Sequence, residues 1–233
     1  FESRKVPLSS SSILLSGSRG LIVLDRAGCV GADGATHHGA YDLSYMRCIP
    51  NMVVSAPMNE EELRNLMFTA QLPKQGPFTI RYPRGRGNLS EWKTPMKEIT
   101  IGKGRRITNG NDLAILSIGH PGNFVQSALE ELESLVASVA HYDMRFVKPL
   151  DESLLHQIFT TYKNIVTIED NCIKGGFGST IAEFASTYNY IIPIIQLGIP
   201  DVFIEHGNLV QLQKSICLDT ESIKQRITNI LKK

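Results

Sequence analysis

Residues 21–45 read LIVLDRAGCVGADGATHHGAYDLSY, a short apolar run that leads into a loop rich in glycine. The first four residues of this stretch are all apolar, which predicts a strand buried on both faces, as in a parallel sheet between layers of helices. In open α/β sheets the ligand crevice lies just beyond the carboxyl ends of the strands. The sequence therefore predicts a ligand site in the loop that begins at Asp25.

The polar residues of this loop suit the binding of an anion. They are Arg26, Asp33, His37 and His38, set among four glycines that favour a tightly folded loop. A guanidinium matches a phosphate or carboxylate, and an imidazole donates to an oxyanion or transfers a proton near neutral pH. The alternative is a solvated surface turn. A ligand site is favoured because the cluster lies between a buried strand and further apolar residues.

A second arginine is expected to reach the same edge. Gly76 and Pro77 precede a predicted strand over 78–82, and Arg84 follows it in the turn. If this strand runs parallel to the first one in the same sheet, Arg84 and Arg26 leave at one edge. Two guanidiniums that converge on one crevice bind a phosphate well. From the residues alone, the alternative interpretation of two solvated arginines on turns is as well supported as a shared phosphate site.

Three longer motifs carry a family resemblance: DRAGCVGADGATHHGAYDLSYMRCIPNMVV, GPFTIRYPRGRG and DMRFVKPLD. The chain resembles the 1-deoxy-D-xylulose 5-phosphate synthase family from about Leu21 to the C-terminus. These transketolase-like enzymes use thiamine diphosphate and Mg²⁺ to condense pyruvate with glyceraldehyde 3-phosphate, with loss of carbon dioxide, for isoprenoid precursor, thiamine and pyridoxal biosynthesis. The serine-rich residues 1–20 do not match and are expected to form a loosely packed leader.

The resemblance implies roles for particular residues. It places Arg26, Asp33, His37 and Arg84 around the phosphate and hydroxyls of the acceptor aldehyde. His37 is the implied catalytic residue, with His38 as an alternative group to protonate or orient the new alkoxide. The family's catalytic glutamate and its domain for the magnesium diphosphate are expected upstream, so no cofactor-binding residue is assigned and the chain alone is expected to be inactive.

The expected architecture is α/β in two parts, both with mostly parallel sheets covered by helices. Residues 21–88 are interpreted as a partial pyrimidine-binding domain of the transketolase type, 89–111 as a linker, and 112–233 as a transketolase C-terminal-type domain. The basic cluster 103–106 within the linker is interpreted as a solvated connection. Within 112–233, apolar runs alternate with amphipathic segments, which predicts βαβ units.

Several other residues have structural explanations that outweigh functional ones. Residues 175–178, GGFG, favour a tight turn before a helix over a phosphate site. Glu169 and Asp170, at a predicted strand end, are explained as well by capping or a salt bridge as by acid–base chemistry. His206 is expected to be packed or to contact a second subunit. The remaining histidines show no metal-ligand spacing, and no protein-held metal is expected.

Composition narrows the function class. A net charge of +1 without a block of Lys or Arg argues against binding to nucleic acid or to an anionic membrane. Four scattered cysteines without a CxxC pair fit reduced thiols, and no apolar run approaches the ~20 residues of a membrane span. We therefore expect a cytoplasmic protein, as a homodimer and with a separate N-terminal polypeptide as a candidate partner.

Two other functions stay open from the sequence. One is the β subunit of a 2-oxoacid dehydrogenase-type thiamine enzyme, although such a subunit is expected to carry its own pyrimidine-site glutamate and none is recognised here. The other is a non-catalytic fragment that folds and dimerises.

Overall fold

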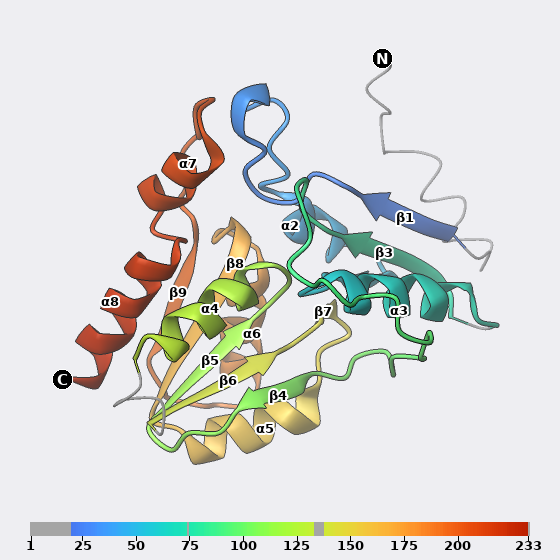
Figure 1. Ribbon diagram of the computed structural model, residues 1–233. Helices are drawn as coiled ribbons and strands as arrows, with labels where there is room; N and C mark the ends of the chain where they lie inside the picture. Colours follow the sequence, from blue (N-terminus) through green and yellow to red (C-terminus); the bar gives the residue numbers. More distant parts are fainter. Residues whose placement is uncertain (1–19, 74, 133–137, 233) are drawn as a thin grey trace.

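The computed structural model describes residues 20–73, 75–132 and 138–232 (Figure 1). The leader predicted over 1–20 lies outside these ranges except for Gly20, which begins the first strand. The elements in chain order are β1 (Gly20–Leu24), η1 (Gly31–Asp33), α2 (Asp42–Met46), β2 (Val53–Ser55), α3 (Glu60–Gln71), β3 (Pro77–Arg81), β4 (Arg105–Thr108), β5 (Leu113–Ser117), α4 (Pro121–Glu130), β6 (Val139–Asp143), β7 (Phe146–Lys148), α5 (Glu152–Thr161), β8 (Asn164–Cys172), α6 (Phe177–Thr187), β9 (Ile194–Ile199), α7 (Leu209–Ser215) and α8 (Thr220–Leu231).

The strands form two sheets. The first has the order β1-β3-β2-β7 and the second the order β4-β6-β5-β8-β9. Within the described residues, only one strand of each sheet, β7 or β4, pairs antiparallel. The predicted fold class, two α/β units with mostly parallel sheets, is confirmed.

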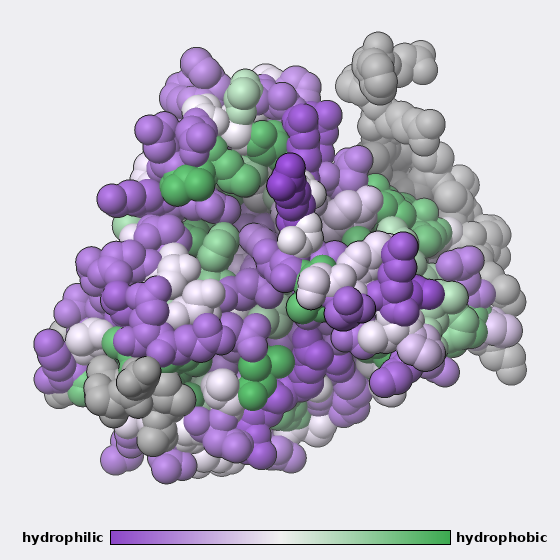
Figure 2. Space-filling model, in the orientation of Figure 1, coloured by the Kyte–Doolittle hydropathy of each residue, from purple (hydrophilic) through white to green (hydrophobic). Residues whose placement is uncertain are grey.

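Helices cover both faces of the second sheet. Side chains of α5 and α6, among them Leu155 and Ile181, pack with one face of β5 and β8, and side chains of α4 and α8, among them Val125 and Ile223, pack with the other. All five residues of β5 and seven of the nine residues of β8 are buried by these two layers. On the face shown in Figure 2, hydrophilic residues predominate and apolar residues form separate small patches.

Helix α3 begins after a residue suited to cap it. The side chain of Asn59 accepts a hydrogen bond of 3.0 Å from the backbone N–H of Glu62, and three glutamates occupy the first turn, where the helix dipole favours negative charge. Leu66 and Ala70, on the apolar face of the helix, are buried against the first sheet.

The predicted burial of β1 on both faces was wrong. Ile22 and Leu24 pack against the core, whereas Leu21 and Val23 on the other face are 39% and 40% exposed. In the described part of the chain, β1 is the edge strand of its sheet and pairs only with β3. An apolar run does not distinguish a central strand from an edge strand.

The chain crosses between the two sheets in a way that the sequence did not predict. After β6 the chain leaves the second sheet. The next strand, β7, pairs antiparallel with β2 of the first sheet, with Val54 opposite Lys148. Phe146 of β7 is fully buried and its ring packs edge-on against that of Phe78, with centroids 6.4 Å apart. The second part of the chain thus completes the core of the first.

The basic cluster 103–106 is not a solvated connection, which corrects the interpretation from sequence. Arg105 starts β4, and its guanidinium lies 3.0 Å from Glu62 and 3.1 Å from Asp143. Lys103 pairs with Asp151 at 2.9 Å. Because their carboxylate partners are buried, these two basic residues connect the segment 103–106 to α3, β6 and the start of α5.

The helices in the described ranges include none with the length and apolar character that a membrane span requires.

Substitution of Phe146 tests whether β7 holds the first sheet together. Phe146→Ala is expected to lower the free energy of unfolding by about 3–5 kcal/mol, because it leaves a cavity against Phe78. Phe203→Ala removes the same ring from a site that is 79% exposed, and this variant is expected to change the free energy of unfolding by less than about 0.5 kcal/mol. Urea denaturation measures both, and equal small effects would contradict a structural role for β7.

Candidate anion-binding site

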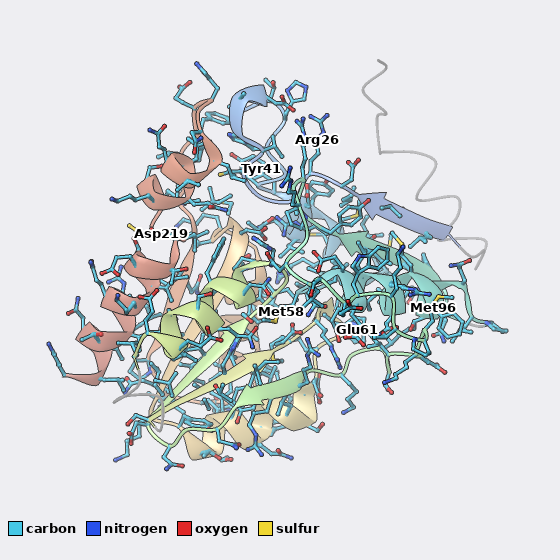
Figure 3. All side chains as sticks on the ribbon, in the orientation of Figure 1. Arg26, Tyr41, Met58, Glu61, Met96 and Asp219 are labelled. Carbon is cyan, nitrogen blue, oxygen red and sulfur yellow. The ribbon has the colours of Figure 1, made fainter. Side chains whose placement is uncertain are left out.

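The site lies at the carboxyl ends of β1 and β3. These strands pair in parallel with Leu24 opposite Arg81, and the pairing continues beyond them, since Ala27 donates to the carbonyl of Tyr82 at 3.0 Å. Residues 25–41, here called the glycine loop, follow β1, and residues 82–88, the arginine loop, follow β3. Both loops therefore leave the sheet side by side, and Figure 3 shows Arg26 at this junction.

The base of the glycine loop is closed by its own backbone. The N–H of Gly39 lies 2.9 Å from the carbonyls of both Arg26 and Gly28, and Gly28 donates back to Gly39 at 3.0 Å. A Cβ at position 39 would lie 2.2 Å from the Arg26 carbonyl oxygen, so only glycine allows this approach. The loop is therefore a closed structure, as its glycines predict.

Arg26 and Arg84 meet at one carboxylate. Nη1 of Arg26 lies 2.8 Å and Nη1 of Arg84 lies 2.6 Å from the same oxygen, Oδ2 of Asp33. The three side chains are 43%, 57% and 32% exposed. The predicted convergence of the two arginines at one edge is thus present in the structure. Exposed ion pairs contribute at most about 1 kcal/mol, so an incoming anion can displace Asp33 at low cost.

His37 belongs to the same cluster, on the side of η1. Its Nδ1 lies 3.1 Å from the backbone carbonyl of Asp33 and 3.0 Å from the hydroxyl of Thr36, and the side chain is exposed. The ring nitrogen that faces the carbonyl acts as a donor, which leaves Nε2 as an acceptor on the neutral ring. His37 can therefore take part in proton transfer with a group bound near the arginines.

His38 points elsewhere. The backbone N–H of Val30 donates to its Nδ1 at 3.1 Å, and its Nε2 lies 3.4 Å from the carbonyl of Glu205. Both ring nitrogens are thus used by the backbone, which fixes the tautomer with the proton on Nε2. The structure brings together Arg26, Asp33, His37 and Arg84, whereas His38 links the loop to the second part of the chain.

A cleft of about 440 Å³ adjoins the arginine loop, between the carboxyl ends of the two sheets. Arg84, Arg86, Asn59, His120 and Asp170 contribute its polar lining. Burial lowers the pKa of His120, although the carboxylates of Asp170 and Glu60 act in the opposite direction. The neutral imidazole is therefore favoured at neutral pH. Met58, labelled in Figure 3, lies on the wall between the two parts.

Glu169 explains the GGFG segment. Its carboxylate accepts hydrogen bonds of 2.8 Å from the backbone N–H groups of Phe177 and Gly178, the first residues of α6. The free donors that an external phosphate would need are thus already satisfied, and the tight-turn interpretation is confirmed. Burial raises the pKa of Glu169 to about 7, and the two hydrogen bonds and Arg81 only partly offset this effect.

Arg81 is the buried charge that the sequence reasoning missed. It is the last residue of β3, is 1% exposed, and pairs with Asp42 and Asp170. The signal was available in the motif IRYPRG, because an arginine inside an apolar strand is rarely buried without a charged partner. The salt-bridge explanation for Asp170 is confirmed. His206, expected to be packed or at a subunit contact, is exposed and lies beside Gly34.

The buried glutamates of the described ranges are engaged in structural contacts. No group of three His, Cys, Asp or Glu side chains in the described ranges can hold a metal ion. Two glutamates in those ranges are buried: Glu62 is paired with arginines, and Glu169 caps α6. Neither is free to activate an aminopyrimidine ring.

Two α/β units with mostly parallel sheets, and charged loops at the carboxyl strand ends, agree with the transketolase class of thiamine diphosphate-dependent transferases. The family models agree with this class: the transketolase pyrimidine-binding domain matches residues 10–88 and the transketolase C-terminal domain matches residues 102–223. The chain belongs to the transketolase family.

Within this family the chain resembles 1-deoxy-D-xylulose-5-phosphate synthases. It is 57% identical to that of Cytophaga hutchinsonii over 211 residues, which cover 90% of this chain and 33% of the relative. It is 51% identical to that of Bacteroides thetaiotaomicron over 208 residues, 89% of this chain and 32% of the relative. The chain thus spans about a third of the length of these relatives.

Solved structures show the same arrangement. A structure titled "Split gene transketolase, inactive beta4 tetramer" has a TM-score of 0.76 and 29% identity, and the match covers 91% of this chain and 66% of that one. The transketolase of Campylobacter jejuni has a TM-score of 0.67 over 95% of this chain and 33% of its own, and at 15% identity it supports the fold alone.

The raised pKa of Glu169 predicts a pH dependence of stability. Its folded pKa of about 7 lies above the ordinary value of 4.5, so the folded chain holds a proton that the unfolded chain releases between these values. This contribution is fully present below pH 4.5 and is lost as the pH rises through 7. The loss is at most on the order of 3 kcal/mol.

Glu169→Gln removes this titration while it keeps an oxygen acceptor. The free energy of unfolding of the wild-type chain is therefore expected to fall relative to that of the variant between pH 5 and pH 8. Denaturant titrations at both pH values measure the difference. Parallel pH profiles for the two chains would show that Glu169 is already ionised at pH 5.

Proposed function

We propose that this chain is the acceptor-binding, C-terminal portion of a 1-deoxy-D-xylulose-5-phosphate synthase, and that it binds glyceraldehyde 3-phosphate. The observation that carries the proposal is the meeting of Arg26 and Arg84 at Asp33, at the ends of two parallel strands. A phosphate dianion offers both guanidiniums stronger, charge-assisted hydrogen bonds than one exposed carboxylate does. The relatives' name and their identity of about half or more support the same assignment.

The chain's own residues divide the binding between them. The arginines hold the phosphate of the acceptor, and Asp33, once displaced, accepts a hydrogen bond from the acceptor's hydroxyl group. His37, whose backbone N–H donates to the carbonyl of Gly34 at 3.0 Å, lies on the same loop beside the backbone of Asp33. In its protonated form it stabilises charge on, or donates a proton to, the oxygen that was the acceptor's carbonyl oxygen.

Thiamine diphosphate, when bound, supplies the carbanion chemistry that joins pyruvate to the aldehyde with loss of carbon dioxide. We place the cofactor and its Mg²⁺ on other residues of the complete enzyme. The absence of a group of three metal-ligating side chains in the described ranges supports this placement. The related split-gene structure, titled as inactive, supports a division in which a chain with these two domains does not turn over alone. Its tetramer supports self-association. A homodimer and a cytoplasmic location stay predictions.

Removal of either arginine tests the acceptor site directly. Arg26→Ala and Arg84→Ala are each expected to weaken the binding of glyceraldehyde 3-phosphate by about 1.5–3 kcal/mol, because each removes a charged hydrogen bond to the phosphate. Arg106→Ala deletes the same charge from an exposed position on β4 and is the matched control. Isothermal titration calorimetry measures the affinities. Equal losses in all three variants would reduce the effect to net charge and would refute a specific site.

The 233-residue chain is expected to yield no 1-deoxy-D-xylulose 5-phosphate from pyruvate and glyceraldehyde 3-phosphate, even with thiamine diphosphate and Mg²⁺ added. The physical reason is that the described residues offer no free buried glutamate and no metal-ligand set. Product detection by mass spectrometry measures turnover. A polypeptide that supplies the relatives' N-terminal part is the complementation control, and product without it would contradict the proposal.

A further inference from the structure

The glycine loop is held from behind by a charge buried between the two sheets. Nη2 of Arg81 donates to the carbonyl of Gly39 at 2.8 Å and to that of Asp170 at 2.9 Å. Nη1 donates to the carboxylate of Asp170, and Nε lies 3.3 Å from Asp42. One guanidinium thus joins the base of the loop, helix α2 and strand β8.

The side chain of Asp170 also packs directly against the glycine loop. Gly28 has a φ of +70°, and a Cβ at that position would lie 2.9 Å from Oδ2 of Asp170. The neighbouring residues of β8 make further contacts. The backbone N–H of Cys172 donates to the carbonyl of Ala40 at 2.5 Å, and the side chain of Asn171 accepts a hydrogen bond of 3.1 Å from the backbone N–H of Leu43 in α2. The end of β8 therefore touches both limbs of the glycine loop at its base.

The base of this loop also sets the position of the anion site. Gly39 is bonded to Arg81 through its carbonyl and to Arg26 through its N–H. Arg26 and Asp33 both lie on the loop that this base closes, and Arg84 lies three residues after Arg81. A shift of Gly39 relative to β3 would separate Arg26 from Arg84. Phosphate recognition by two forks depends on their spacing to within a fraction of an ångström.

We propose that Asp170, through Arg81, is a positioning residue by which the C-terminal sheet sets the geometry of the anion site. This inference rests on the proposed function for its ligand, but the contact itself is independent of any ligand. Asp170 does not touch the bound anion. It neutralises Arg81 and fixes the orientation of the guanidinium, which in turn fixes Gly39 and the arginine that is bonded to it.

The test compares the full chain with two matched variants. Asp170→Asn removes the negative charge and keeps the shape of the side chain. Glu183→Gln makes the same change in the ion pair between Arg47 and Glu183, which also joins the two parts of the chain but lies away from the glycine loop, with Glu183 64% exposed. Amide hydrogen exchange is measured over 26–41 and, as an internal reference, over β5.

Asp170→Asn is expected to speed exchange of the glycine-loop amides about tenfold relative to β5 and to weaken binding of glyceraldehyde 3-phosphate about tenfold. Glu183→Gln is expected to change neither. A role in overall stability alone would speed exchange in β5 and the loop together, and this outcome would overturn the proposal, as would unchanged loop exchange in Asp170→Asn.

A second variant applies if Asp170→Asn does not fold. Arg81→Lys keeps a positive charge beside Asp170 but has a single nitrogen, which does not reach Asp170 and Gly39 together as the fork does. It is expected to speed loop exchange in the same way, and unchanged loop exchange in a folded Arg81→Lys chain overturns the proposal. If the wild-type chain does not bind glyceraldehyde 3-phosphate, the proposed function fails, while the exchange data still decide the positioning role.

Discussion

The parallel, in-register pairing of β1 with β3 is the constraint on which the site depends. With Leu24 opposite Arg81, both strands end at the same level, and the bond from Ala27 to Tyr82 carries the pairing into the loops. Two arginines far apart in the sequence thereby reach one carboxylate. A slip of one residue would turn every side chain of β1 to the other face and would move Arg26 away from Arg84.

Two kinds of ion pair lie at this edge of the sheet: exposed pairs at Asp33 and buried pairs at Arg81. The exposed pairs suit ligand exchange, and the buried pairs suit a structural role. The pairs at Asp33 are exposed and screened, so they exchange partners readily when a stronger anion arrives. The pairs at Arg81 are buried, and separating them would leave an uncompensated charge in the interior. Burial lowers and the carboxylates raise the pKa of Arg81, with a net increase, so its charge is permanent. A replaceable anion site thus rests on a frame that does not rearrange.

Sequence reasoning succeeded where the signal is local and failed where the partner is remote. The glycines of residues 25–41 predicted a tightly folded loop, and the position of Arg26 and Arg84 after apolar runs placed them at one edge. Nothing local in FVK shows that β7 joins the first sheet, because pairing partners leave no pattern in an isolated strand. The exposure of β1 and the partners of Lys103 and Arg105 were missed for the same reason. The roles of the four site residues remain predictions.

Charged pairs between the two parts favour one docking geometry in addition to the shared apolar core. Arg145 binds Glu62 through two hydrogen bonds of 2.8 Å, and Arg105 bridges Glu62 and Asp143. Burial raises the pKa of Asp143 to about 6, and the adjacent Arg105 acts against this increase. An apolar contact tolerates sliding, whereas guanidinium forks on carboxylates fix distance and direction together. Since the glycine loop lies between β3 and β8, this fixed docking is what allows the second sheet to define a site built on the first.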